Sequence, residues 1–351
     1  LISEYVLNIL FELRHPRHYY QFKAIYDILK ERGHLVKIIA TERTLLIDIL
    51  KEENEDFILL KHTTSGSIVL KLLSYFISFN QFVKSVKKYN IDLLVSKASM
   101  SSCFLKLIKP NLRAVIFPDS EDVWLTNNFV RYFSDLIILP NIFPLKWSTK
   151  KVVRVNGTCE NCYLDPKYFH PQKLNPLDYG YDEGAKFVFF RFVAWKAHHD
   201  RGQYGFSINE RKEIVDLFIK YGYTPLISFE DKPDAELKQY INRFPQNEIR
   251  SVLTLCDYFV GDSQSMSAEA ALLGVKSFRY NSWVLNDVIN FKYFNQQHLL
   301  LNFSNYNELK NALIDSLEGK LDFFRPIYDY WVKCGDINTY ICDVLEQRFI
   351  K

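Results

Sequence analysis

Guanidinium, ammonium, imidazole, carboxylate and indole groups are gathered in the twelve residues from Arg191 to Gly202. Arg191 can bind a diphosphate through its planar fork, and Lys196 can add a point charge. His198 begins a His-His-Asp run, a composition also found in metal sites. Adjacent side chains point apart, and neither an H-x-x-x-H spacing nor a fourth ligand accompanies them, so we expect no metal. The segment predicts a cationic pocket for a nucleotide diphosphate.

A second anion site is predicted where small hydroxyl residues open a helix expected over Ser267–Leu273. The backbone N–H groups of Ser265, Met266 and Ser267 would face an anion there, and the helix dipole adds about half a positive charge. Glu269 is expected in the first turn, where it would repel a phosphate unless it faces ribose hydroxyls. An ordinary helix capped by serine is the alternative interpretation.

Two groups of side chains that could take a proton from a hydroxyl follow strands of the first half. His15 and His18 come directly after the first apolar stretch, and an imidazole can act as a general base near neutral pH. Asp119 and Glu121 follow the strand expected over Ala114–Phe117, and either could be the base or could orient a histidine. Solvated histidines and an acidic helix start are the alternatives. The sequence does not choose among the four residues.

Short apolar strands alternate with helix-like periodicities along the chain, a pattern typical of parallel sheets covered by helices on both faces. Ligands of such sheets bind beyond the carboxyl ends of the strands, which is where the polar segments above are placed. The expected strands are Val6–Phe11, Val36–Ala40, Phe57–Leu60, Asp92–Ser96, Ala114–Phe117, Leu136–Leu139, Phe187–Phe192, Pro225–Phe229, Tyr258–Val260 and Val275–Arg279. A helix is expected to begin at Ala235.

Turn residues concentrate over residues 157–182 and mark the best domain boundary in the sequence. We therefore expect two α/β domains, residues 1–165 and residues 166–325. The remaining segment, residues 326–351, is expected to form a C-terminal helix that packs back across the domains.

Composition excludes several classes of protein. Lys and Arg number 44 against 41 Asp and Glu in 351 residues, and a net charge of +3 predicts no nucleic-acid partner. The sequence has no glycine-rich phosphate loop of the P-loop or dinucleotide type. Six scattered cysteines do not fit a disulfide-stapled protein, and we interpret the C-x-x-C spacing of Cys159 and Cys162 as coincidence. Without a secretory signal pattern, we expect a cytoplasmic location.

The long helix expected over Ile68–Tyr89 carries several lysines, namely Lys71, Lys84, Lys87 and Lys88. A core-packed helix with a solvated basic face explains this pattern. Peripheral contact of the N-terminal domain with the inner face of the membrane is the alternative.

On these residues, the chain resembles a family of bacterial and archaeal predicted glycosyltransferases with the GT-B fold, along nearly its whole length. The landmarks of the resemblance are His15-Pro16-x-His18, Phe22-Lys23, Gly33-His34, Asp119-Ser120-Glu121, the string Arg191–Asp200 and the helix-closing Gly274. More distantly, Asn247–Gly274 is similar to the donor site of the lipid-linked GlcNAc transferases and of UDP-GlcNAc 2-epimerases. That similarity implies a diphosphate at the helix N-terminus, ribose on Glu269 and the base near Ile249. Asp262 departs from the glycine-rich turn of these families, and its carboxylate would repel a diphosphate.

The resemblance implies two Rossmann-like domains with parallel sheets facing across a cleft, with the acceptor on the first and the donor on the second. It implies a metal-independent glycosyltransferase without a cofactor. Such an enzyme would move a sugar from a nucleotide diphosphate, with a UDP-sugar favoured, to a glycan or glycolipid acceptor in surface polysaccharide or glycolipid biosynthesis. A nucleotide-sugar 2-epimerase or hydrolase using the same cleft is the alternative, and a binding protein without turnover is the third.

Overall fold

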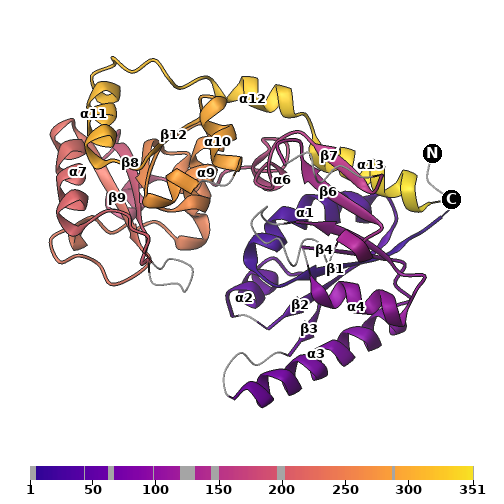
Figure 1. The fold of residues 1–351 in the computed structure, drawn as a ribbon. Coiled ribbons are helices and arrows are strands. Elements are labelled where there is room, and N and C mark those ends of the chain that lie inside the picture. The colour runs from indigo at the N-terminus through magenta and orange to yellow at the C-terminus, as the bar shows by residue number, and fades with distance from the viewer. Residues whose placement is uncertain are drawn as a thin grey trace. The chain divides into compact units, whose positions relative to one another are not determined.

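The chain forms two compact units, shown in Figure 1. The computed structural model describes residues 5–42, 44–61, 67–97, 99–118, 131–143, 150–195, 202–286 and 289–350. Unit 1 contains residues 1–165 and 334–351, and unit 2 contains residues 166–333. Each unit is a Rossmann-like parallel sheet with helices on its faces, so the predicted fold class is confirmed.

The sheet of unit 1 has seven strands in the described residues, in the order β3-β2-β1-β4-β5-β6-β7, all paired in parallel. The strands are β1 (Asn8–Leu13), β2 (Leu35–Thr41), β3 (Phe57–Leu60), β4 (Leu93–Lys97), β5 (Arg113–Phe117), β6 (Leu136–Pro140) and β7 (Val152–Val155). The helices are α1 (Pro16–Glu31), α2 (Thr44–Glu52), α3 (Ile68–Lys88), α4 (Met100–Ile108), α6 (Asn161–Leu164) and α13 (Ile337–Phe349). The strand order reverses between β1 and β4, which is the point where ligands of such sheets bind.

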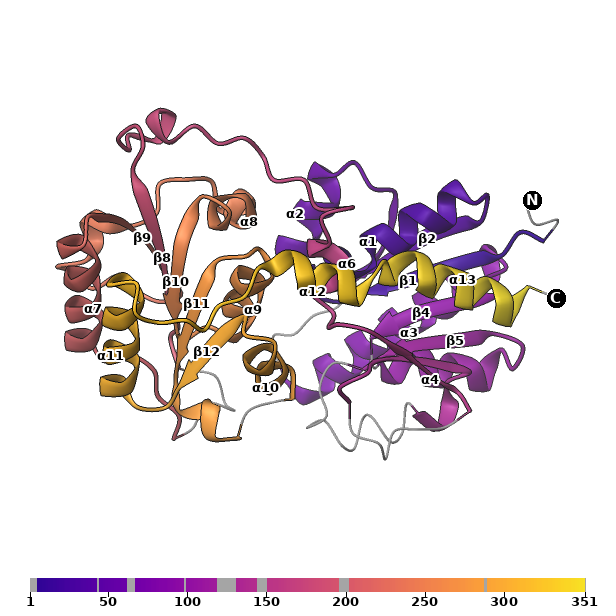
Figure 2. The ribbon, with the colours of Figure 1, turned by 90° about the horizontal axis from the view of Figure 1, so that it is seen from above.

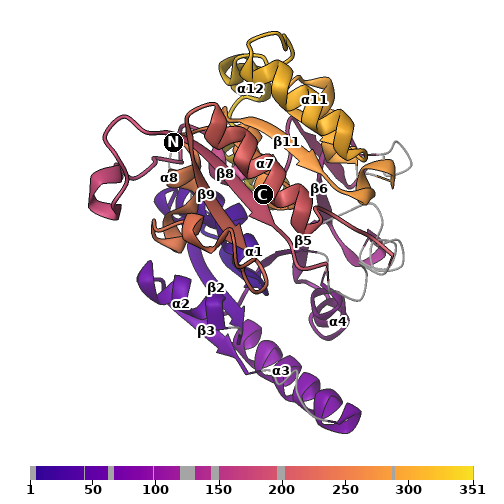
Figure 3. The same ribbon diagram turned by 90° about the vertical axis from the view of Figure 1, so that its left-hand side faces the viewer.

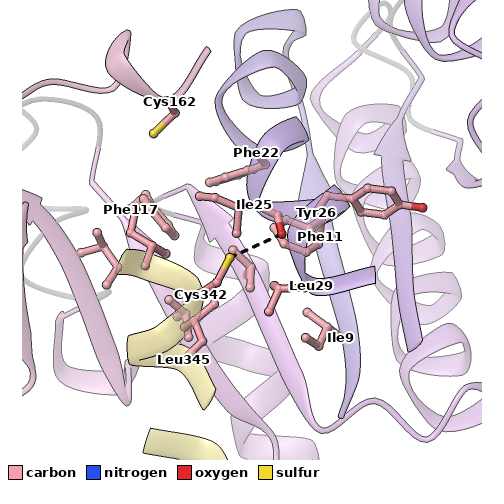
Figure 4. Packing of buried hydrophobic residues seen from close by; sticks show 14 of the residues in the cluster. Ile9, Phe11, Phe22, Ile25, Tyr26, Leu29, Phe117, Cys162, Cys342 and Leu345 are labelled. Carbon is pink, nitrogen blue, oxygen red and sulfur yellow. Dashed lines mark hydrogen bonds between the residues drawn. The ribbon is translucent and has the colours of Figure 1, made fainter. Parts of the chain in front are cut away.

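Successive residues of a strand point to opposite faces, and each face of this sheet is covered by its own helices. Ile9 and Phe11 of β1 contribute to the core formed with α1, α2 and α13, whereas Leu10 contributes to the core formed with α3 and α4. The C-terminal helix α13 completes the first of these cores. Its Cys342 donates to the carbonyl oxygen of Ile25 in α1 at 3.7 Å (Figure 4). Helix α13 is therefore part of unit 1, although the 181 residues from 156 to 336 separate it from β7 in the sequence.

Unit 2 has a five-stranded parallel sheet in its described part, in the order β12-β11-β10-β8-β9. The strands are β8 (Lys186–Phe192), β9 (Tyr223–Phe229), β10 (Cys256–Gly261), β11 (Lys276–Tyr280) and β12 (Leu300–Phe303). The helices are α7 (Ile208–Lys220), α8 (Ile249–Leu253), α9 (Gln264–Leu272), α10 (Ile289–Gln296) and α11 (Tyr306–Leu317), followed by α12 (Ile327–Cys334), which leads into unit 1. Figure 2 shows α7 and α11 on one face of this sheet and α8, α9 and α10 on the other.

Three local features differ from the sequence prediction. The helix expected from Ala235 is only a short 3₁₀ turn over Lys238–Tyr240, because Ile241 pairs with Ile227 of β9 and draws the chain along the sheet. Strands β7 and β12 are not among the expected strands, since a four-residue strand gives only a weak pattern, although β3 has the same length and is predicted. Helix α9 begins at Gln264, three residues before the expected start. Among the described residues, no helix has both the length and the apolar character needed to cross a membrane.

Candidate functional site

Arg191 lies at the carboxyl end of β8, between β9 and β10. The strand register sets Ser228, Arg191 and Gly261 side by side in one row. Arg191 lies two residues after Phe189, which packs against α8 and α9, so its side chain projects from that same face. Its Nη1 donates a hydrogen bond to the Ser228 hydroxyl at 2.7 Å. Burial lowers the pKa of Arg191, but an arginine remains a cation at neutral pH.

The N-terminus of α9 follows β10 after only two residues, which places it next to Arg191 in the sheet. Gly261 makes the turn possible, because a Cβ there would lie 2.7 Å from the carbonyl oxygen of Arg191. Ser263 caps the helix by accepting the N–H of Met266 at 3.4 Å, and the Ser263 carbonyl accepts the N–H of Ser267. These two N–H groups are therefore already used within the helix.

The N–H groups of Gln264 and Ser265 are the ones left to face a ligand. Within the described residues, neither N–H group donates a hydrogen bond. Ser265 is exposed. Ser267 is instead buried, with its hydroxyl donating to the carbonyl of Gln264 at 2.8 Å. The predicted anion site thus keeps Ser265 but replaces Met266 and Ser267 by Gln264, since the helix begins earlier than expected.

The side chain of Asp262 is hydrogen-bonded to the loop that follows β8. Its buried carboxylate accepts the backbone N–H of Val193 at 2.7 Å and the indole Nε1–H of Trp195 at 3.0 Å. Burial raises the pKa of Asp262 to about 6. The carboxylate therefore fastens the loop after β8 to the loop after β10. The repulsion expected between Asp262 and a diphosphate is reduced because both carboxylate oxygens accept hydrogen bonds from this loop.

Glu269 and Ile249 lie on neighbouring helices near the same sheet edge. Because α9 begins at Gln264, Glu269 stands in the second turn, and its predicted place in the first turn is wrong. Its buried carboxylate accepts from Arg250 Nε of α8 at 3.3 Å. Ile249 is the first residue of α8 and is partly buried against the core. A ribose contact by Glu269 and a base contact near Ile249 stay predictions.

Four of the predicted site residues, Lys196, His198, Asp119 and Glu121, lie outside the described residues. Their roles stay predictions as well. In the part of the chain that is described, no three His, Cys, Asp or Glu side chains are grouped so as to hold a metal ion.

His15 and His18 lie at the carboxyl end of β1 and the start of α1, with ring centroids 6.2 Å apart. The Nδ1 of His15 accepts the N–H of Arg17 at 3.2 Å, and the Nδ1 of His18 accepts the N–H of Arg14 at 3.3 Å. An Nδ1 that accepts a hydrogen bond places the proton of a neutral ring on Nε2. In this arrangement both rings present a donor, and both help to fix the turn between β1 and α1.

Sequence reasoning missed a buried polar network beside these histidines. Glu12 at the end of β1 accepts from Arg14 Nε at 2.7 Å, from Ser99 at 3.1 Å and from Ser102 at 2.9 Å. Arg14 also donates to Ser101 at 2.9 Å. The serines follow β4, so the network joins the carboxyl ends of the two strands at the reversal point. A lone glutamate inside an apolar strand was the available signal, because such a carboxylate needs partners.

A second buried carboxylate of unit 1 pairs with Arg17. Glu160 forms a salt bridge with Arg17 and accepts the Thr158 hydroxyl at 2.6 Å. Burial acts to raise the pKa of Glu160, but Arg17 and Thr158 outweigh it, and the pKa is lowered. Burial raises the pKa of the Cys159 thiol to about 11 and raises that of Cys162 as well. Both cysteines are free thiols held in their protonated, unreactive form.

No family model matches the sequence, and the search of curated proteins found no match. Solved structures match across the whole chain, however. The spinosyn forosaminyltransferase SpnP has a TM-score of 0.67 at 12% identity, over 98% of this chain and 100% of that chain. A putative UDP-N-acetylglucosamine 2-epimerase from Listeria monocytogenes has a TM-score of 0.70 at 10% identity, over 98% and 97%.

A third similar structure is the UDP-GlcNAc 2-epimerase from Neisseria meningitidis bound to UDP-GlcNAc. Its TM-score is 0.68 at 11% identity, over 97% of this chain and 99% of that chain. At these identities the likeness concerns the fold. The chain has the two-unit architecture of GT-B glycosyltransferases and UDP-GlcNAc 2-epimerases.

Proposed function

We propose that this protein is a glycosyltransferase that uses a nucleotide-diphosphate sugar bound to unit 2. The observation that carries the proposal is the position of Arg191, one strand away from the turn that opens α9. A guanidinium and the N–H groups of Gln264 and Ser265 would there hold the diphosphate between a fixed cation and a helix dipole. The similar structures support this assignment, because they include a forosaminyltransferase and an epimerase bound to UDP-GlcNAc.

The chemistry required of unit 2 is stabilisation of a departing nucleoside diphosphate. Negative charge grows on the diphosphate as its bond to the sugar breaks, and preorganised donors stabilise that charge. Arg191 has a neutral hydroxyl as its hydrogen-bond partner in the described residues, and the carboxylates of Glu230 and Asp262 act on it only through space, so its guanidinium could still bind the leaving group. Lys196 would add a second cation. With that charge supplied by the chain, the proposal requires neither a divalent cation nor a cofactor, and UDP is the favoured nucleotide.

The acceptor, a glycan or glycolipid hydroxyl, would bind at unit 1 and lose its proton to a general base. His15, His18, Asp119 and Glu121 remain the candidates. Either histidine would have to surrender its Nδ1 hydrogen bond before Nε2 could accept a proton. This cost favours Asp119 or Glu121 as the base and gives the imidazole N–H groups the task of orienting the acceptor or the carboxylate.

Titration of UDP into wild type and Arg191→Ala, followed by calorimetry, tests the donor site. We expect the affinity to fall about 30-fold, since a hydrogen-bonded charge contributes about 2 kcal/mol. Arg325→Ala is the matched control, because the Arg325 side chain in the same unit is 49% exposed and pairs with Asp322. Equal affinities of wild type and Arg191→Ala would refute the assignment of the diphosphate to this edge.

The alternative function is a nucleotide-sugar 2-epimerase or hydrolase, which the two similar epimerase structures favour. Both functions use the same donor site, so the Arg191 variant does not separate them. Incubation of the protein with UDP-GlcNAc and no acceptor separates the two functions, and NMR follows the products. A C2 epimer or rapid release of free sugar identifies the alternative, whereas a donor that is stable until an acceptor is added supports the transferase.

A further inference from the structure

Helix α3 has an apolar solvent face in its first half. The side chains of Leu70, Leu73, Phe76 and Ile77 lie on one side of the helix, and their residues are 55%, 55%, 69% and 56% exposed. Their spacing of three and four residues places them in a single stripe. Isolated apolar residues on a surface are ordinary, but a continuous stripe indicates an interaction site.

This stripe is distinct from the face of α3 that builds the core of unit 1. Phe82 and Val86 are buried against the sheet, with Phe79 and Val83 packed beside them. Gln81 anchors the same side by donating to the carbonyl of Leu59 at 2.6 Å. A surface helix needs one apolar face for its core, so the second apolar face of α3 is unexplained by folding.

Helix α4 extends this apolar surface. Its Phe104, Leu107 and Ile108 are 38%, 62% and 47% exposed. The two helices are held together by the edge contact of Phe79 with Phe104, whose ring centroids lie 6.3 Å apart. Figures 1 and 3 show α3 and α4 at the edge of unit 1. We call Leu70, Leu73, Phe76, Ile77, Phe104, Leu107 and Ile108 together the α3–α4 surface.

Positive charge accompanies the α3–α4 surface. The exposed stripe of α3 continues from its apolar half into Lys84, Lys87 and Lys88, all of which are exposed. The sequence contains no acidic residue in either helix, and Asp92 is the only one from Phe57 to Pro118. Apolar side chains followed by lysines, with no carboxylate between them, match the layers of an anionic bilayer, in which acyl chains lie beneath negative headgroups.

We propose that the α3–α4 surface docks unit 1 onto the surface of an anionic phospholipid bilayer. The apolar side chains would enter the boundary between headgroups and acyl chains, while the lysines contact phosphates. A protein partner fits the observations less well, because its surface would have to supply an apolar patch together with an acidic row. The proposal is independent of the donor site on unit 2.

Sedimentation with lipid vesicles tests the proposal. We expect the wild-type protein to bind vesicles of phosphatidylcholine containing about 30% phosphatidylglycerol, and to bind pure phosphatidylcholine vesicles at least tenfold more weakly. Leu73→Glu and Phe76→Glu should each lower the partition coefficient at least tenfold. Lys84→Gln with Lys87→Gln should lower it about fivefold per lysine, the effect of roughly one headgroup interaction each.

Leu45→Glu is the matched control, since Leu45 is 65% exposed on α2 of the same unit, and its vesicle binding should equal that of wild type. Leu107→Glu on α4 is a second test that leaves α3 intact, and circular dichroism verifies that each variant is folded. Absence of wild-type binding to anionic vesicles would overturn the proposal, as would unchanged binding of the α3 and α4 variants. A wild-type dimer that Phe76→Glu converts to a monomer, without vesicle binding, would show a surface between copies of the chain instead.

Discussion

The two units differ in the hydrogen-bond partners of the ionised side chains at the carboxyl ends of their sheets. In unit 1 each buried carboxylate meets a guanidinium, with Glu12 on Arg14 and Glu160 on Arg17. In unit 2 the buried Glu269 also pairs with a guanidinium, that of Arg250, but the buried Asp262 is held by neutral N–H donors, and Arg191 donates to a neutral hydroxyl. Arg191 and Asp262 of unit 2 therefore have neutral hydrogen-bond partners, although Glu230 and Asp262 still act on the Arg191 guanidinium through space.

This difference separates charges that hold the fold from charges that are available to a ligand. A paired charge has its field largely cancelled by its partner, and breaking a buried pair leaves an uncompensated ion. A charge on a neutral partner keeps its field and can bind an ion of opposite sign. Unit 1 thus uses its ion pairs to join strands and helices, whereas Arg191 of unit 2 is the cation that we propose for the diphosphate.

Glu12→Ala is expected to have the largest effect on stability. Removing this buried carboxylate leaves Arg14, Ser99 and Ser102 without the acceptor of their hydrogen bonds. We therefore expect the free energy of unfolding to fall by about 3 kcal/mol. Urea denaturation followed by circular dichroism measures the change. Arg191→Ala should change the same quantity by less than about 1 kcal/mol. If the two variants were equally destabilised, the contrast between the units would be broken.

The pH dependence of unfolding is expected to differ in sign between Asp262 and Glu160. The pKa of Asp262 is raised from 3.8 to about 6 in the folded chain, so its contribution to stability is present at low pH and is lost as the pH rises from about 4 to 6. Asp262→Asn removes this loss. Between about pH 4 and pH 6, the free energy of unfolding of the variant should rise relative to that of wild type, by an amount on the order of 3 kcal/mol.

Glu160→Gln provides the opposite case in unit 1. Because the folded chain lowers the pKa of Glu160 below its ordinary value of 4.5, its stabilisation is complete above that pH and is lost as the pH falls through the folded value. The advantage of wild type over Glu160→Gln should therefore shrink on acidification below about 4.5. Urea midpoints measured between pH 3 and 7 decide both cases, and equal slopes for the two variants would contradict the comparison.

His15→Ala should have the smallest effect. His15 caps α1 through its Nδ1, and loss of a helix cap lowers the free energy of unfolding by about 1 kcal/mol. The affinity for UDP should not change, because His15 belongs to unit 1 and the proposed donor site to unit 2. Thermal melting with and without UDP measures both quantities. A His15→Ala protein that binds UDP more weakly would show that unit 1 takes part in donor binding.

Much of the fold follows from local pattern. The apolar runs at Phe187–Phe192 and Tyr258–Val260 predicted two strands that the structure contains, and the alternation with helices predicted parallel sheets. The placement of Arg191 at the carboxyl end of a strand and of small hydroxyl residues at a helix start also follows from sequence. Periodicity is a property of neighbouring residues, so it is readable without the fold.

The tertiary structure determines which side chains are hydrogen-bond partners. Glu12 accepts a hydrogen bond from Ser99, which lies 87 residues further along the chain. The strand order of the sheet brings β1 and β4 together. The same holds for Asp262, whose carboxylate faces Trp195 across 67 positions, and for Gln264, which takes the place predicted for Ser267 because the cap falls at Ser263. The order of residues determines which charges stand at the sheet edges, and the three-dimensional packing determines which of them are neutralised, because Coulomb and hydrogen-bond energies depend on distance in space.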